Sequence, residues 1–112
     1  MPESSSRHED AIDDFVERVQ ARGLPSVRRL LVFGSVARGT HSSDSDIDVL
    51  AIVTEDADVT TVEEELRDVA YDVMLDHGTV FSIHGVSQET LDSRSDHPFF
   101  RRVTSEGRAI YG

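Results

Sequence analysis

Residues 30–53 read LLVFGSVARGTHSSDSDIDVLAIV, and this stretch decides how the chain folds. It begins with the apolar run LLVF and ends with VLAIV. Short continuous apolar runs bounded by turn residues are typical of strands that are covered on both faces. The residues between the runs are rich in Gly, Ser and Asp, which favour a turn and a loop. The stretch therefore predicts two buried strands, Val27–Phe33 and Asp46–Val53, joined by a loop over residues 34–45 that includes a helical turn at 36–38.

Apolar spacing on either side of this stretch predicts further elements. In His8–Gln20, apolar residues recur with the spacing of an amphipathic helix, and Gly23 ends that helix. The other expected elements are a helix capped by Thr60 or Thr61 and ended by Gly78, a strand over Thr79–Val86, a short helix over Ser87–Leu91 with Ser87 as its cap, a helix from Pro98 to Gly107, and an edge strand over Ala109–Tyr111. Helices that alternate with strands in this way predict an α/β fold.

The length and composition indicate one small domain. A chain of 112 residues holds one modest core, so we expect a flexible N-terminal lead over residues 1–7 and a single domain over residues 8–112. Cysteine is absent, which excludes disulfides, thiolate metal sites and a cysteine nucleophile. The polar start of the chain does not have the pattern of a secretory signal, and no apolar run has the length of a membrane span. We therefore expect a cytoplasmic location.

The charge balance is strongly acidic. The chain has 22 acidic residues against 11 basic ones, for a formal net charge of −11, and every basic residue is Arg. Such a charge repels nucleic acid, so direct nucleic-acid binding is not expected. Acid excess without any Lys also resembles proteins of salt-loving archaea, in which concentrated salt screens the repulsion. A merely acidic protein remains the alternative.

The turn after the first buried strand has the features of a phosphate site. Gly34 lets the backbone approach a ligand closely. Free N–H groups at a helix start attract phosphate, and the Ser35 hydroxyl can add a donor. Arg38, just before Gly39, can add a cation that contacts phosphate or a carboxylate.

Two carboxylates follow at the start of the second strand. Asp46 and Asp48 are two residues apart, so the period of a strand sends both side chains to one face. Paired carboxylates repel each other unless a cation lies between them, and Mg²⁺ prefers one or two carboxylates together with substrate phosphates. A glycine turn alone is usually only a turn, and an Asp-x-Asp pair alone is usually a solvated strand start. Their combination favours a site for a metal and a nucleoside triphosphate.

The pattern of residues 34–48 resembles that of the minimal nucleotidyltransferases of the DNA-polymerase-beta-like superfamily. Their motif is G-S-x-A-R-G, five residues, then S-D-I-D, and this chain matches each of those positions. The resemblance implies a mixed β-sheet with flanking helices. It also implies that Gly34 and Ser35 hold the triphosphate, that Asp46 and Asp48 ligate Mg²⁺ as the catalytic pair, and that an acceptor hydroxyl attacks the α-phosphate of ATP.

One position departs from the family pattern. Active members carry a third carboxylate on a neighbouring strand, but the expected strand Thr79–Val86 contains no Asp or Glu. Ser82 or His84 would occupy the third position, because both lie on one face of that strand. Asp72 and Asp76 are alternatives for the third acid, but they lie on the preceding helix, where they form an acidic row with Asp68 that is expected to be a solvated face. The histidines other than His84 are expected to be surface or capping residues: His8, His41, His77 and His97.

The family resemblance also implies a partner. Minimal nucleotidyltransferases are commonly paired with a helical HEPN-type toxin, and they silence it by transferring AMP to one of its tyrosines. The first hypothesis is therefore an ATP- and Mg²⁺-dependent protein adenylyltransferase that acts as an antitoxin. The alternative is a nucleotidyltransferase-fold binding module that has little or no activity and neutralises its partner by forming a complex.

Overall fold

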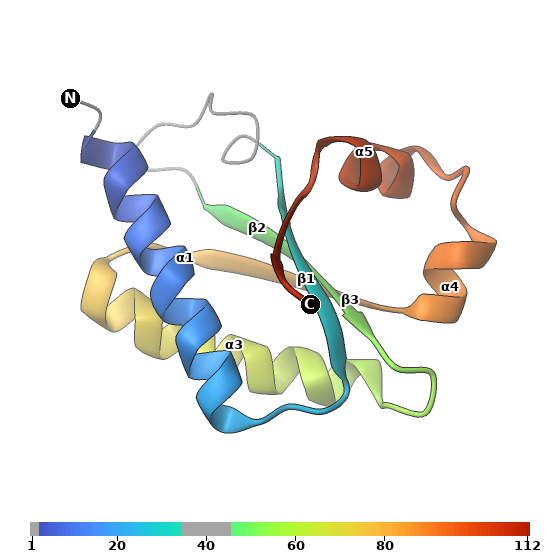
Figure 1. Cartoon of the computed structure of the whole chain (residues 1–112), viewed down its shortest axis with the longest axis horizontal. Helices are drawn as coiled ribbons and strands as arrows, with labels where there is room; N and C mark the ends of the chain where they lie inside the picture. The colour runs from blue at the N-terminus through green and yellow to red at the C-terminus, as the bar shows by residue number, and fades with distance from the viewer. Residues whose placement is uncertain (1–2, 35–45) are drawn as a thin grey trace.

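The computed structural model describes residues 3–34 and 46–112 (Figure 1). Its elements are α1 (Glu3–Arg22), β1 (Val27–Phe33), β2 (Ile47–Val53), α3 (Val59–His77), β3 (Phe81–Ser87), α4 (Gln88–Ser93), α5 (Pro98–Glu106) and β4 (Arg108–Tyr111). The strands of this described part form one sheet in the order β3-β2-β1-β4. β2 and β3 are parallel, whereas β1 is antiparallel to both β2 and β4. The expected α/β fold with a mixed sheet and flanking helices is confirmed.

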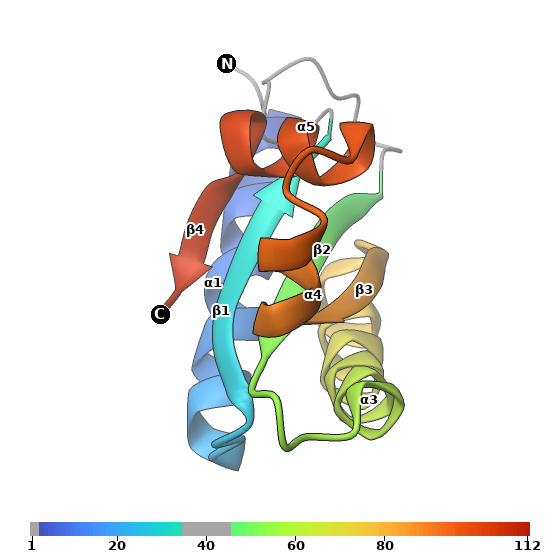
Figure 2. The same cartoon turned by 90° about the vertical axis from the view of Figure 1, so that its right-hand side faces the viewer.

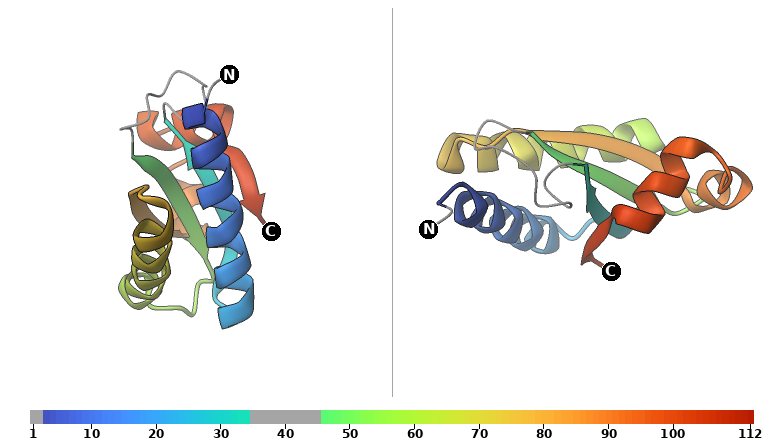
Figure 3. Two further views of the ribbon diagram at one scale, coloured as in Figure 1. Left: turned by 90° about the vertical axis from the view of Figure 1, so that its left-hand side faces the viewer. Right: turned by 90° about the horizontal axis from the view of Figure 1, so that it is seen from above.

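Helices cover both faces of the sheet. α1 and α3 lie on one face, and α4 and α5 lie on the other (Figures 2 and 3). The residues of β1 alternate between these layers: Leu30 and Val32 belong to the core beneath α1 and α3, whereas Leu31 and Phe33 belong to the core beneath α4 and α5. Apolar side chains are therefore buried on both faces, which is why β1 and β2 are continuous apolar runs rather than alternating ones.

Helix α1 starts earlier than the apolar spacing indicates. It begins at Glu3 rather than at His8, so residues 3–7 of the expected lead are helical in the structure. Adding residues to an existing helix needs no new nucleation, so a helix can extend past its last buried residue. Within α1, His8 is 1% exposed, and the expectation of a surface or capping role for it is wrong. His8 lies four and seven residues before Ile12 and Phe15, so it shares their buried stripe.

The pair α1 and α3 is held in place by an aromatic contact and by charges. The rings of Phe15 and Phe81 stack with their centroids 4.8 Å apart, which ties α1 to β3. Asp14 of α1 accepts a hydrogen bond from Arg18 at 3.0 Å and contacts Nε2 of His77, in the last turn of α3, at 3.0 Å. These contacts hold α1 and α3 together as the helical layer that covers one face of β2 and β3.

Helix α3 begins slightly earlier than expected. Its cap is Asp58, whose side chain accepts a hydrogen bond from the N–H of Thr60 at 3.1 Å, so the expected Thr60 or Thr61 cap is wrong. Asp is among the strongest N-cap residues, and its carboxylate also interacts favourably with the helix dipole. The expected C-terminal end is confirmed, because Gly78 adopts a φ of +72° and donates its N–H to the carbonyl oxygen of Met74.

Side chains of α3 cover the outer edge of β3. Oε2 of Glu63 accepts a hydrogen bond from the N–H of Gly85 at 2.5 Å, and Arg67 donates to the carbonyl oxygen of Ile83 at 3.2 Å. The strand spans Phe81–Ser87 rather than Thr79–Val86, a shift of one or two residues. These two hydrogen bonds satisfy backbone groups that an edge strand otherwise exposes to other chains.

The C-terminal elements follow the sequence expectations closely. Ser87 caps α4, His97 caps α5 by accepting from the N–H of Phe99, and Gly107 follows the end of α5. β4 pairs with β1 at the sheet edge, as expected for an edge strand. The acidic residues Asp68, Asp72 and Asp76 are exposed along α3. Among the described residues, no helix combines the length and apolarity required for crossing a bilayer.

Candidate functional site

The site lies where β1 ends and β2 begins. Phe33 of β1 is paired with Asp48 of β2, which is in turn paired with Ser82 of β3. Ile47 and Val49 both point into the core beneath α1 and α3, so Asp48 between them points to the opposite face, which α4 and α5 cover. The register therefore places an aromatic ring, a carboxylate and a hydroxyl in one row across three strands.

Gly34 lies directly against the carboxylate of Asp48. Its φ is +79°, and a Cβ built on it would lie 2.6 Å from Oδ2 of Asp48. Only glycine fits this position, because a side chain would be strained by the backbone and would also displace the carboxylate. The turn that the sequence predicts as a phosphate site therefore adjoins one of the two predicted metal ligands.

Asp46 lies beside Asp48 and Ser82. It directly precedes β2 and is exposed, and the hydroxyl of Ser82 lies 3.5 Å from its Oδ2, at the long limit of a hydrogen bond. Burial raises the pKa of the Asp48 carboxyl above its ordinary value, the nearby His84 lowers it, and the negative charge of Asp46 raises it. The charged form of Asp48 is thus disfavoured by its surroundings, and a bound cation would favour it.

His84 joins a group of aromatic rings on the same face of the sheet. Its ring centroid lies 6.0 Å from that of Phe33 and 6.3 Å from that of Phe99 in α5. The rings of Phe33 and Phe99 meet edge to face at 5.6 Å. The sequence indicates the histidine as a candidate but not the phenylalanines, because Phe33 and Phe99 have the pattern of ordinary apolar positions in a strand and a helix.

Other predicted site residues lie outside the described residues. These are Ser35, Arg38 and Gly39, together with the predicted turn at 36–38. Within residues 3–34 and 46–112, no group of three or more His, Asp or Glu side chains is arranged to hold a metal ion. The described part of the site therefore offers the two carboxylates of Asp46 and Asp48, with Ser82 and His84 next to them.

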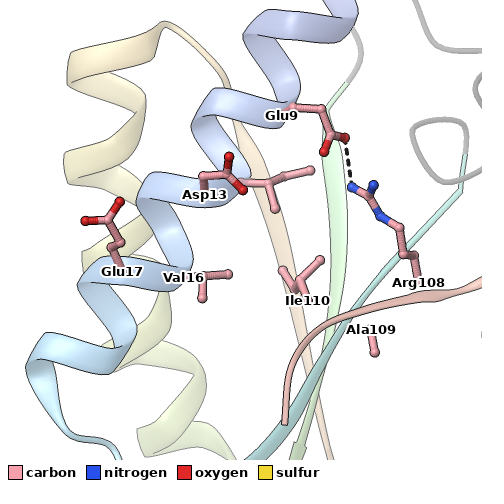
Figure 4. A pocket seen from close by; sticks show the side chains of 8 residues that line it. Glu9, Asp13, Val16, Glu17, Arg108, Ala109 and Ile110 are labelled. Atoms are coloured by element: carbon pink, nitrogen blue, oxygen red, sulfur yellow. Dashed lines mark hydrogen bonds and ion pairs between the residues drawn. The ribbon is translucent and has the colours of Figure 1, made fainter.

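A separate groove lies between α1 and β4 (Figure 4). It has a volume of about 480 Å³. Glu9, Asp13 and Glu17 line it from α1, and Arg108 of β4 forms an ion pair with Glu9 at 2.8 Å across one end. Three carboxylates against one guanidinium make this groove unfavourable for an anionic nucleotide. The groove therefore does not compete with the carboxylate pair as the nucleotide site.

The sequence of the chain matches a known family over most of its length. The family profile of the nucleotidyltransferase domain matches residues 12–104, a range that includes Gly34, Asp46 and Asp48. The chain belongs to the nucleotidyltransferase domain family. A curated relative is "Putative protein adenylyltransferase MJ0604" of Methanocaldococcus jannaschii. This chain is 30% identical to it over 103 residues, which cover 92% of this chain and 97% of the relative.

Solved structures agree with the nucleotidyltransferase fold. A crystal structure of a "putative nucleotidyltransferase" from Sulfolobus solfataricus superposes with a TM-score of 0.54 at 25% identity, covering 81% of this chain and 77% of that one. A chain from the complex of tri-AMPylated Shewanella oneidensis HEPN toxin with MNT antitoxin gives a TM-score of 0.56 at 15% identity, covering 93% and 71%. At that identity the second likeness shows the shared fold alone.

The residues at the candidate site fit a divalent metal. Carboxylate oxygens are the hard ligands that Mg²⁺ prefers, and it commonly takes one or two of them together with substrate phosphates. Asp46 and Asp48 supply such oxygens, and the pKa of Asp48 is raised, chiefly by burial and also by the charge of Asp46. The donor set therefore suits a metal that arrives together with a triphosphate.

Proposed function

We propose that this chain is an ATP- and Mg²⁺-dependent nucleotidyltransferase that transfers AMP to a hydroxyl of a partner protein. The observation that carries the proposal is the close approach of Gly34 to the carboxylate of Asp48. It brings the turn that is predicted to bind phosphate next to the carboxylate pair. The family match and the adenylyltransferase name of the curated relative support the same chemistry.

Each residue of the site has a role in this proposal. Asp46 and Asp48 would hold the divalent metal, which would supply charge compensation to the triphosphate and to the attacking oxygen. Gly34, Ser35, Arg38 and Gly39 receive the triphosphate through backbone N–H groups, a hydroxyl and a guanidinium. The acceptor oxygen forms a bond to the α-phosphorus, the bond from that phosphorus to the β-phosphate bridging oxygen breaks, and pyrophosphate leaves.

We propose that β3 supplies the residue at the position where active family members carry a third carboxylate. Ser82 and His84 are the candidates, since Ser82 is in register with Asp48 and His84 is two residues further along the same face. Neither is a carboxylate, so the acceptor hydroxyl must lose its proton to a group other than a third Asp. His84 or a side chain of the partner would take that proton.

The proposed partner is a HEPN-type helical toxin, and the proposed acceptor is one of its tyrosines. The family resemblance supports this partner, and so does the structural neighbour that comes from the complex of a HEPN toxin with an MNT antitoxin. AMP on the toxin would silence it, so the chain would act as an antitoxin. We place the pair in the cytoplasm, where ATP is available.

The test uses the chain together with the protein encoded by the neighbouring gene, ATP and Mg²⁺. We expect the mass of the partner to rise by about 329 Da for each AMP transferred. Asp46→Asn with Asp48→Asn should abolish both this increase and Mg²⁺-dependent ATP binding by calorimetry. The matched control is Asp68→Asn with Asp72→Asn, which removes two exposed carboxylates from α3. If the double site variant still binds ATP like the unmodified chain, the site assignment is wrong.

A binding module without activity is the second candidate. The observation that favours it is the composition of β3, in which Ser82 and His84 lie where a carboxylate would complete the site. In that case the chain blocks the toxin without any mass increase on either protein. Unchanged neutralisation by the Asp46→Asn, Asp48→Asn variant would then identify complex formation as the mechanism.

A further inference from the structure

An exposed aromatic ring lies on the sheet face that carries Asp48. Phe99 in α5 is 38% exposed, whereas Phe33, whose ring it meets edge to face, is 8% exposed. Pro98 at the first position of α5 and His97 as its cap fix where the helix begins, and thereby fix Phe99 over the end of β1. A phenyl ring held this way at a polar site exposes apolar surface that the core does not require.

The exposed surface includes a second ring. The side chain of His84 is exposed, and its ring contacts both Phe33 and Phe99, with interplanar angles of 51° and 69°. Phe33 is the last residue of β1, directly before Gly34, and it is paired with Asp48. Two exposed rings therefore rest on a buried one, next to the turn and the carboxylate of the proposed active site.

The other large exposed hydrophobic residues lie elsewhere in the described part of the chain. Tyr71 and Leu75 belong to α3, and Val80 lines a hollow against that helix. α3 packs on the opposite face of the sheet from α5. Phe99 is therefore distinguished by its place beside the site, and Tyr71 provides an exposed aromatic residue for comparison.

We propose that Phe99 and His84, supported by Phe33, form a platform on which a flat aromatic ring of one reactant stacks. The inference rests on the proposed function, whose two reactants each carry such a ring: the nucleobase of ATP and the phenol of an acceptor tyrosine. Ring pairs stack with an offset or meet edge to face, and both arrangements suit a partly exposed phenyl ring. Stacking on aromatic side chains is a common means of binding a base.

The experiment uses a fluorescent reporter at the platform. The chain contains no tryptophan, so Phe99→Trp introduces a single indole there, and Tyr71→Trp introduces one on the opposite face as a control. We expect a ring that stacks on the platform to quench the fluorescence of the Phe99→Trp variant and to leave that of the Tyr71→Trp variant unchanged. ATP against ribose 5-triphosphate, both with Mg²⁺, tests the nucleobase. N-acetyltyrosinamide against N-acetylserinamide, with a non-hydrolysable ATP analogue present, tests the phenol.

Calorimetry on a variant without the ring gives the second readout. Phe99→Leu keeps an apolar side chain over Phe33, so α5 should stay folded by circular dichroism. If the base stacks, this variant should bind Mg²⁺-ATP about tenfold more weakly than the unmodified chain, with an unchanged affinity for ribose 5-triphosphate. If the phenol stacks, the KM for the partner protein should rise by about the same factor, with unchanged ATP binding. Tyr71→Leu should change neither quantity.

Three results separate the platform from the proposed function. Quenching of the Phe99→Trp variant by a ring probe without any AMP transfer to a partner refutes the transfer and supports the platform. AMP transfer with the same ATP affinity and the same KM in Phe99→Leu refutes the platform and leaves the transfer intact. Absence of quenching in the Phe99→Trp variant with every ring probe overturns the platform, whatever the transfer assay gives.

Discussion

Gly34 combines a left-handed backbone conformation with close packing against the carboxylate of Asp48. We predict that Gly34→Ala abolishes Mg²⁺-ATP binding, because the new Cβ would lie 2.6 Å from Oδ2 of Asp48 and would displace that carboxylate. The matched control is Gly23→Ala. Gly23 has a similar φ of +66° but no atom within 4 Å of its Cβ position, so the variant should lose only about 1–2 kcal/mol of stability from backbone strain. Equal ATP affinities in the two variants, measured by calorimetry, would contradict the predicted contact.

The charge of Asp48 should lower the stability of the folded protein. Its pKa is raised in the folded protein, chiefly by burial, so the folded state binds the proton more tightly than the unfolded state does. Ionisation above that raised pKa therefore reduces stability, and the loss disappears as the pH falls through the raised pKa towards 3.8. We predict that Asp48→Asn, which stays uncharged, melts at a higher temperature than the unmodified chain at pH 7 in EDTA.

The pH profile supplies the control for this prediction. The difference in melting temperature should shrink as the pH is lowered, because Asp48 of the unmodified chain then becomes protonated as well. Asp68→Asn, at an exposed position of α3, should show no such difference at pH 7. A lower melting temperature for Asp48→Asn at neutral pH would mean that the carboxylate stabilises the protein in the absence of metal.

At the scale of elements, the contact between α3 and the outer edge of β3 holds the third strand of the site in register. A Cβ at Gly85 would lie 2.7 Å from Cγ of Glu63 and 2.9 Å from Cγ1 of Val59. We predict that Gly85→Ala lowers the free energy of unfolding in urea by about 1–3 kcal/mol, the usual cost of overpacking. The same substitution in a Glu63→Ala background should cost less, because the Cγ is then absent. Equal costs in both backgrounds would show that Glu63 does not restrict this position.

At the scale of the whole molecule, the dominant feature is a net charge of −11 on 112 residues. Repulsion among these charges destabilises the compact state, and added salt screens it. We predict that the melting temperature rises between about 0.1 M and multimolar KCl. The variant Asp68→Asn with Asp72→Asn should show a smaller rise, since it carries less charge. A flat or falling curve would contradict the proposed adaptation to concentrated salt.

Local sequence patterns predicted most of the elements of the fold. The continuous apolar runs of β1 and β2 predicted strands with two covered faces, and Ser87, Pro98 and Gly107 marked the helix ends that the structure shows. These signals are local because capping and burial depend on neighbours within one turn or one strand. The predicted start of α3 was wrong because local signals were ambiguous there. Asp58, Thr60 and Thr61 are all acceptable N-cap residues, and the structure has Asp58 as the cap.

The candidate site divides in the same way between sequence and tertiary structure. The sequence by itself determined which residue types are present: Gly34, Asp46 and Asp48 in a spacing that the nucleotidyltransferase domain shares, and no carboxylate on β3. The sequence also predicted that Ser82 or His84 takes the third position. Only the tertiary structure decided that Phe33 and Ser82 lie in register with Asp48, that Phe99 reaches this face from α5, and that His8 is buried. The physical reason is that strand register and helix docking are set by packing between segments far apart in the chain, and no local pattern records them.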